Sequence, residues 1–231
     1  GKNIYDEVDE TKYNKYLVVL KERDWHVEIG EEKFPVDKND FSFTRNGEKI
    51  LFDFAYITIH GVPGENGLLQ GYLDMMGVPY GCCNVLASAL TFDKHTCNTY
   101  LKSYGVNVAD SVMLIRGMAY DVNEIINEVG LPCFVKPNAE GSSFGVTKVK
   151  EAAQLEDALK KAFALCREVL IETFIDGTEL TCGVVKAGDM DITMPIAEVV
   201  PKNEFFDFEA KYDPTKSDEI IPARISPELT N

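Results

Sequence analysis

Strand-like and helix-like segments alternate over roughly the first 90 residues, which limits the folds open to this chain. Two short apolar runs (YLVVL and WHVEI) open the pattern, a polar excursion follows up to Gly47, and residues 54–59 (FAYITI) have the composition of a buried strand. Residues 66–76 carry apolar side chains at helical spacing, with Asn66 as the candidate N-cap and a glycine just past the end. This order of strand, loop and helix predicts a doubly wound α/β domain.

A different pattern follows from residue 93. Helical segments are separated by strands close enough in sequence to form hairpins, which predicts an α+β region with helices to one side. The expected helices are residues 93–103, 121–129 and 151–166, and the expected strands are residues 112–115, 133–137, 146–149, 168–175, 179–186 and 192–200. Residues 203–217 fit neither period and predict an irregular loop. We predict an α/β fold class with a doubly wound domain at residues 1–87 and an α+β domain in two parts, residues 88–171 and 172–231.

Composition excludes several classes of partner. The chain has 23 Lys and Arg against 38 Asp and Glu, a formal net charge of -15, and this field argues against nucleic acid and anionic membranes as partners. Its apolar runs are far shorter than the roughly 20 residues that cross a bilayer. The six cysteines include no C-x-x-C pair, so neither a zinc site nor a disulfide framework is expected. Free thiols are typical of a reducing compartment, and we expect a cytoplasmic protein.

The stretch CFVKPNAEGSSFGV, residues 133–146, carries Lys136 near the end of an apolar run and continues into a loop of small residues. An ammonium group beside unblocked backbone N–H groups suits a polyphosphate, and Ser142 and Ser143 add hydroxyl donors. The loop is not a Walker A motif, in which the lysine follows the glycines. Taken alone, a Gly/Ser hairpin with a surface lysine explains the stretch equally well.

Two further stretches contain candidate ligand groups. His60 follows the strand-like run 54–59 and precedes three glycines and a helix start, the position where open α/β sheets bind ligands. A histidine that only caps a loop is an equal alternative. In EVLIETFIDGTEL, Glu172 and strand carbonyls could accept from an adenine amino group, and Glu179 could hold ribose hydroxyls. The alternative there is an ordinary hairpin with solvated carboxylates.

The run NEFFDFEAKYDPTK, residues 203–216, alternates phenylalanines with acids before Lys211 and Tyr212. Aromatic side chains are seldom so dense in a free linker, which predicts that the segment packs over something. It could be a lid over a site or a patch that binds a protein partner.

Taken together and in this order, these stretches resemble the ATP-grasp enzymes, and specifically the D-alanine:D-alanine ligase family. HGVPGENGLLQG is similar to the family's H-G-x-x-G-E-D-G-x-x-Q-G, LASALTFDK to its A-S-A-x-x-M-D-K, and LPCFVKPNAEGSSFGV to its P-x-x-V-K-P-x-x-x-G-S-S-x-G. EVLIETFIDGTELTCGVV and EFFDFEAKY are similar to its adenine-site strand and its ω-loop. The resemblance extends from Tyr56 onward and implies a pre-ATP-grasp domain followed by an ATP-grasp domain.

The resemblance implies a nucleotide site. Lys94 and Lys136 would contact the ATP phosphates, and Ser142 and Ser143 would lie in the loop that covers them. Glu172, the strand backbone after it and Glu179 would hold adenine and ribose. The ATP-binding residues would be, in chain order, Lys94, Lys136, Ser142, Ser143, Glu172, Thr173, Phe174, Ile175, Glu179 and Lys211.

The resemblance also implies a catalytic group made of His60, Ser142, Lys211 and Tyr212. His60 would lie near the D-alanine substrates, and Lys211 would reach the transferred phosphoryl group from an ω-loop that closes over both substrates. One D-alanine carboxylate would attack the γ-phosphate of ATP to give an acylphosphate, and the amine of a second D-alanine would then expel phosphate, for peptidoglycan precursor synthesis. Lysines and Mg²⁺ (or Mn²⁺) suit phosphoryl transfer because it needs neutralised charge and alignment. A homodimer is also implied.

The chain departs from the family pattern in three places. Asn66 replaces the aspartate of G-E-D-G, and Phe206, Asp207 and Phe208 replace Y-D-Y, which keeps the aromatic bodies but loses two hydroxyls. The family's opening strand, with its substrate-binding glutamate, and its closing aspartate and E-x-N segment, which ligate magnesium, have no counterpart here. We therefore assign no metal ligands and expect the chain as given to be inactive.

Two alternatives stay open. D-alanine:D-lactate ligases resemble the same family but lack the E-A-K-Y form of the ω-loop, so Tyr212 favours an amine acceptor. A non-catalytic nucleotide-binding fragment is the alternative from another functional class.

Overall fold

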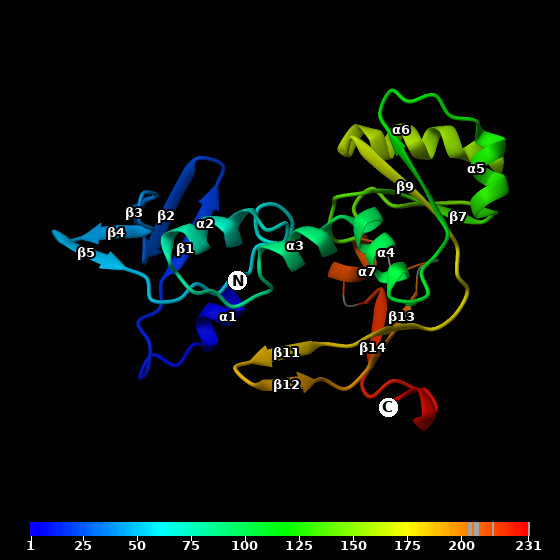
Figure 1. Ribbon diagram of the computed structural model, residues 1–231. Coiled ribbons are helices and arrows are strands. Elements are labelled where there is room, and N and C mark those ends of the chain that lie inside the picture. Colours follow the sequence, from blue (N-terminus) through cyan, green and yellow to red (C-terminus); the bar gives the residue numbers. More distant parts are fainter. Residues whose placement is uncertain (203–204, 206–207, 214, 231) are drawn as a thin grey trace. The chain divides into compact units, whose positions relative to one another are not determined.

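The first five strands form one antiparallel sheet in which each strand pairs with its neighbour in the chain (Figure 1). The computed structural model describes residues 1–202, 205, 208–213 and 215–230. It divides into two units, Gly1–Phe92 and Asp93–Asn231. The helices and strands of the first unit are α1 (Lys2–Glu7), β1 (Leu17–Lys21), β2 (Asp24–Ile29), β3 (Glu32–Asp37), β4 (Ser42–Arg45), β5 (Glu48–Leu51), α2 (Leu68–Met76) and α3 (Val85–Phe92).

The prediction of a doubly wound sheet is wrong for these five strands. The predicted polar excursion contains β3 and β4. In β3, Phe34 and Val36 point inward while their neighbours are exposed and mostly charged, and in β4 Ser42 and Phe43 are buried and Arg45 is the charged residue. Asn46 and Gly47 both have positive φ, 52° and 81°, which gives the tight turn between β4 and β5. Among residues 1–92, parallel pairing is limited to the bridge between Ala55 and Tyr80.

The prediction of a buried strand at residues 54–59 is wrong as well. Phe54 and Tyr56 are more than half exposed, at 54% and 63%, and the segment holds only the backbone bonds on either side of Ala55. These are Ala55 N–H to Pro79 O and Gly81 N–H to Ala55 O, both 2.9 Å. Ala55, Ile57 and Ile59 pack partly buried against the core of this unit, so the run is covered on one side but forms no strand.

Helix α2 closes the core of the first unit. Leu69 and Leu73 pack with Val27 and Phe43 of the sheet, and Leu73 and Val27 are fully buried. The helix ends at Gly77 as predicted, with φ 69°. Its N-cap is Gly67 rather than Asn66. Helix α3 was not predicted because VLASALTF is apolar almost throughout and has no amphipathic period.

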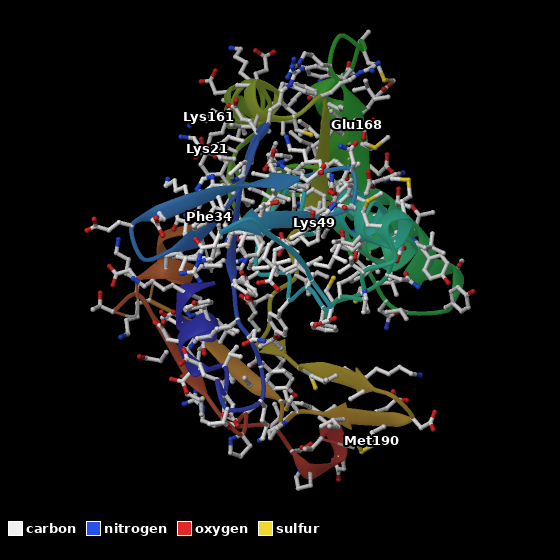
Figure 2. The ribbon with its side chains drawn as sticks, turned by 90° about the vertical axis from the view of Figure 1, so that its left-hand side faces the viewer. Lys21, Phe34, Lys49, Lys161, Glu168 and Met190 are labelled. Atoms are coloured by element: carbon white, nitrogen blue, oxygen red, sulfur yellow. The ribbon has the colours of Figure 1, made fainter. Side chains whose placement is uncertain are left out.

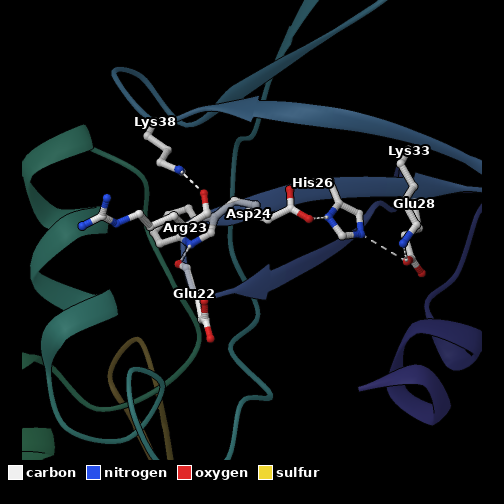
Figure 3. A network of polar contacts seen from close by, with 8 residues as sticks. Glu22, Arg23, Asp24, His26, Glu28, Lys33 and Lys38 are labelled. Atoms are coloured by element: carbon white, nitrogen blue, oxygen red, sulfur yellow. Dashed lines mark hydrogen bonds and ion pairs between the residues drawn. The ribbon is translucent and has the colours of Figure 1, made fainter.

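Strand β2 carries a polar network around a buried histidine (Figure 3). His26 Nδ1 lies 3.4 Å from Asp24 Oδ2, and its Nε2 lies 3.3 Å from Glu28 Oε1. The contact with His26 is the largest cause that lowers the pKa of Glu28, and Lys33, 3.4 Å away, acts in the same direction. Asp24, His26 and Glu28 alternate along β2 and so share a face of the sheet, and Lys33 is the residue of β3 that pairs with Glu28. No candidate ligand motif falls in this network, and we regard it as part of the sheet's structure.

The second unit is built on an antiparallel sheet of order β6-β9-β7-β8, with α5 and α6 packed against it (Figure 1). Its elements are α4 (Lys94–Ser103), β6 (Ser111–Ile115), α5 (Val122–Val129), β7 (Cys133–Pro137), β8 (Thr147–Val149), η1 (Ala152–Gln154), α6 (Leu155–Leu165) and β9 (Glu168–Thr173). Val135 and Ile171 of the sheet share a core with Ile125 of α5 and Leu159 of α6. The predicted helices and strands of this region are confirmed, and the fold is a mixed α/β one with antiparallel sheets.

The last part of the chain forms a three-stranded sheet, order β10-β13-β14, and a separate hairpin, β11 and β12. The elements are β10 (Glu179–Thr181), β11 (Val184–Ala187), β12 (Met190–Thr193), β13 (Ala197–Pro201), α7 (Phe208–Tyr212), β14 (Ser217–Ile220) and η2 (Pro227–Leu229). Figure 2 labels Met190, which lies by the turn of the hairpin and is 61% exposed. The predicted strands 179–186 and 192–200 are each divided in two.

Two local features separate the hairpin β11–β12 from strands β10 and β13. Pro195 has no N–H to give to a sheet, and Met194 N–H donates to Gly183 O (2.8 Å) at the open end of the hairpin. Residues 203–217, predicted as an irregular loop, contain α7 and the start of β14. Phe206 and Asp207 of the aromatic run lie outside the described residues.

The pair Glu198 and Arg224 predicts a pH dependence of stability. The Arg224 side chain donates to both carboxylate oxygens of Glu198, at 2.9 and 2.6 Å, and its backbone N–H donates at 3.1 Å. These bonds lower the pKa of Glu198 to about 2. Because the folded pKa lies below the unfolded one, the stabilisation is complete above the unfolded pKa and is lost as the pH falls toward 2.

We expect R224A to be clearly less stable than the wild type in urea unfolding at pH 6, with a smaller difference at pH 3. The exposed pair of Lys202, just after β13, and Asp218 on β14, 3.1 Å apart, provides the control, and K202A should change little at either pH. A gap between R224A and wild type that does not narrow at pH 3 would contradict the assignment.

Candidate functional site

Lys94 is the first residue of α4, at the point where the helix meets the loop after β7. Asp93 caps the helix by accepting from Thr96 N–H at 2.7 Å. Asn138, fully buried, accepts from His95 N–H at 2.9 Å and donates to Asp93 at 2.7 Å. The helix start and the loop are therefore fixed to each other by one amide side chain.

The ammonium group of Lys94 is held by backbone carbonyls. Its Nζ donates to Glu140 O at 2.6 Å and to Asn138 O at 3.3 Å. Burial lowers the pKa of Lys94, and the positive charge of Lys136 lowers it further. The two lysines that the sequence singled out, 42 positions apart, thus lie close enough in space for one charge to act on the other.

Lys136, on β7, forms an ion pair with Glu172 on β9. Phe134 pairs with Glu172 in the strand register, so Lys136 lies two residues further along the neighbouring strand. The other carboxylate oxygen of Glu172 accepts from Asn98 Nδ2 at 2.8 Å. Sequence patterns missed both asparagines: Asn98 lies outside every candidate motif, and Asn138 lies inside the 133–146 stretch but was given no role there.

The loop after β7 has an unusual backbone. Ser142 and Ser143 both have positive φ, 53° and 56°, a region that non-glycine residues rarely occupy. Gly145 has φ 74°, and a Cβ there would come within 2.4 Å of Leu165 Cδ1. The Ser142 hydroxyl lies 2.5 Å from the Tyr212 hydroxyl, which joins the loop to α7. The predicted loop and the predicted lid segment are therefore in direct contact.

Two backbone donors after Glu172 are already bonded. Thr173 N–H donates to Asp110 O at 2.9 Å, and Phe174 N–H donates to Pro132 O at 3.3 Å. A nucleoside contact with these two residues would therefore use their carbonyls, while Ile175 beyond them is 67% exposed.

Aromatic rings gather beside this strand end. The ring of Phe134 lies 5.9 Å from that of Phe174 and 5.1 Å from that of Phe205. Lys148 Nζ lies 3.9 Å from the centre of the Phe174 ring. The aromatic run thus has one ring, Phe205, packed on the sheet of this unit, as expected of a segment that covers something.

Glu179 lies on β10, at the exposed surface, where neighbouring protein atoms desolvate it enough to raise its pKa. The charge of Lys211 acts in the opposite direction. Lys211, on α7, is therefore within electrostatic reach of Glu179. These two residues were predicted for ribose and for the phosphoryl group respectively.

His60 belongs to the first unit. Its side chain is 77% exposed, and Nδ1 lies 3.6 Å from Glu65 Oε1, while Glu65 Oε2 accepts from Gly61 N–H at 2.6 Å. The loop is fixed further by Gln70, fully buried, which donates to Gly64 O at 2.6 Å. A Cβ on Gly64 would lie 2.3 Å from Ile59 O, so this turn requires glycine.

The described residues contain no group of three or more His, Cys, Asp or Glu side chains that could hold a metal ion. In the same part of the chain, no helix has the length and apolar character of a membrane span.

The chain is similar to one family throughout. The family described as "D-ala D-ala ligase C-terminus" matches residues 100–231. The D-alanine–D-alanine ligase of Bacteroides fragilis (strain YCH46) is 54% identical over 231 residues, which is 100% of this chain and 71% of that protein. The enzyme of the same name from Parabacteroides distasonis is 55% identical over 228 residues, 98% of this chain and 69% of that protein.

Solved structures agree with this result. The VanG D-Ala:D-Ser ligase from Enterococcus faecalis matches with a TM-score of 0.81 and 28% identity, over 98% of this chain and 72% of that one. A D-alanine–D-alanine ligase from Bacillus anthracis complexed with ATP matches with a TM-score of 0.63 and 30% identity, over 77% of this chain and 55% of that one.

Proposed function

The chain belongs to the D-alanine–D-alanine ligase family, and from this premise we infer that it joins two D-alanine molecules with consumption of ATP. The observation that carries the inference is the meeting of Lys94, Lys136 and Glu172 beside the loop of Ser142. The ligated product serves peptidoglycan precursor synthesis.

We propose that Lys94 and Lys136 bind the ATP phosphates. Two ammonium groups at partly buried positions neutralise charge that builds up during phosphoryl transfer, and this is most effective where water is scarce. Burial lowers the pKa of Lys94 most and the nearby charge of Lys136 lowers it further, and a bound polyanion would offset this destabilisation of the ammonium group. Ser142 and Ser143 are proposed to cover the phosphates with their backbone N–H groups and hydroxyls.

The nucleoside is proposed to lie at the end of β9. Glu172, the carbonyls of Thr173 and Phe174, and Ile175 would contact adenine, and Glu179 would accept from ribose hydroxyls. Mg²⁺, when bound, would offset the charge of the phosphates, and we assign no residue of this chain to hold it.

His60 is proposed to contact the D-alanine substrates, and Lys211 to contact the transferred phosphoryl group. The Ser142–Tyr212 hydrogen bond supports a lid role for α7, because it ties the segment to the phosphate loop. A closed lid would protect the acylphosphate from water. The division into three domains, the homodimer, and a cytoplasmic location stay predictions; the six free cysteines favour the last of these.

The test is a coupled assay on the full-length protein that contains this sequence, with ATP, Mg²⁺ and D-alanine. We expect phosphate release that depends on D-alanine and gives the dipeptide. Substitution of D-lactate for the second D-alanine should give little ester, since Tyr212 belongs to the E-A-K-Y form. Nucleotide binding without phosphate release would favour a non-catalytic binding module instead. The same assay carried out on the 231-residue chain alone decides whether the chain as given turns over by itself.

A further inference from the structure

Helix α4 presents two side chains to the same place. Asn98 follows Lys94 by four positions, so both lie on one face of the helix. The negative charge of Glu172 acts to raise the pKa of Lys94, and Asn98 donates to Glu172 Oε1 at 2.8 Å. Asn98 belongs to none of the motifs that assign a nucleotide site.

Glu172 is held from two sides. Oε2 pairs with Lys136 Nζ, and Oε1 accepts from Asn98. The residue is only 7% exposed, so water offers little replacement for either partner. Without the Asn98 hydrogen bond the Glu172 carboxylate could rotate. The Lys136 ammonium group could then pair with either oxygen and would no longer be held in one position.

We propose that Asn98 is a positioning residue for the nucleotide: by fixing Glu172, it aims the ammonium group of Lys136. An ammonium has three N–H donors, and a carboxylate tied at Oε1 engages Lys136 through Oε2 alone. The remaining donors of Lys136 then face the ligand. This proposal rests on the proposed function of the same site, and it adds a residue that acts through another.

The charged groups that face Glu172 are few. Lys136 comes from β7 and Lys94 from α4, while Glu140 acts on Lys94 from the loop. In the strand register the neighbours of Glu172 are Ser111 on β6 and Phe134 on β7, neither of which is charged. A new carboxylate at position 98 would therefore meet Glu172 directly.

The experiment measures binding of a non-hydrolysable ATP analogue by calorimetry to the full chain. N98A should weaken binding about tenfold, the usual effect of losing a hydrogen bond to a charged group. N98D should weaken it more at pH 8, because two carboxylates repel, and should recover in part at pH 6, where the pair shares a proton. N98A should show no such recovery relative to the wild type.

The matched control is K102A on the same helix. The Lys102 side chain is 66% exposed and pairs with Asp110 at the surface, so its removal should leave binding unchanged. K102A should melt within about 2 °C of the wild type. N98A and N98D should melt several degrees lower, because Glu172 loses a hydrogen bond at a buried position, so binding is compared at a temperature well below all the melting points. If N98A and N98D both bind within twofold of the wild type, Asn98 does not position the site. A wild type that binds the analogue but forms no dipeptide would overturn the ligase function while leaving the result on Asn98 standing.

Discussion

Lys136→Ala is expected to lower kcat/KM for ATP by at least about 100-fold in the full-length protein. The substitution removes one of the two ammonium groups that we propose bind the phosphates, and preorganised charges of this kind contribute most to phosphoryl transfer. It also leaves Glu172, 7% exposed, without its ion partner. The bare carboxylate would then repel the nucleotide. Steady-state kinetics with varied ATP measure the effect.

The same variant should lose stability, by about 2–3 kcal/mol, because breaking a mostly buried pair leaves one charge uncompensated. The double variant K136M/E172Q removes both charges and should recover most of that stability without recovering activity. K186A is the control, since Lys186 pairs with Asp191 on an exposed hairpin, 3.7 Å apart. If K136A kept both its ATP kinetics and its stability, Lys136 would be an ordinary surface lysine.

Sequence patterns predicted the second unit better than the first for a physical reason. Strand β9 is buried on both faces and β7 alternates buried with half-buried residues, so CFVKP and EVLIET read as strands from their apolar composition. Helices α4 and α5 begin at aspartate caps, and α5 ends at a glycine, as the local rules require. Local signals and tertiary structure agree there.

In the first unit the local signals and the structure disagree. Strand β3 has exposed charged residues beside Phe34 and Val36, and β4 is only four residues long with two polar residues and one charge, so their composition resembles that of a loop. The FAYITI run has the opposite problem, since an apolar composition does not reveal that Phe54 and Tyr56 are exposed. An apolar run therefore predicts a buried strand correctly only where other parts of the fold pack against both of its faces.

The candidate site shows a similar limit. Lys94, Lys136 and Glu172 could be found from their motifs, because each stands in a recognisable run. Asn98 and Asn138 act through contacts between segments 30 to 74 positions apart, and no local pattern marks such partners. Their roles depend on the fold, which brings α4, the loop after β7, and β9 together.

Asn138→Ala is expected to have the largest effect on stability, about 2–4 kcal/mol in urea unfolding, because three side-chain hydrogen bonds of a fully buried amide are lost together. Asn138 accepts from His95 N–H at 2.9 Å and donates to Asp93 at 2.7 Å and to Glu168 at 3.2 Å (Glu168 is labelled in Figure 2). The backbone carbonyl of Asn138 also accepts from the Lys94 backbone N–H at 3.2 Å, a bond that the substitution leaves in place. One side chain thus joins the start of α4 to β9.

Nucleotide affinity should fall in the same variant, because Lys94 loses the anchor that holds its helix against the loop. N138D offers a sharper comparison: it keeps the acceptor for His95 but puts a third carboxylate beside Asp93 and Glu168, so it should be less stable than N138A at pH 8 and closer to it at pH 5. N123A is the control, an exposed asparagine on α5 whose loss should cost less than about 0.5 kcal/mol. Were N138A as stable as N123A, the start of α4 would be held by other contacts, and the placement of Lys94 would not depend on this amide.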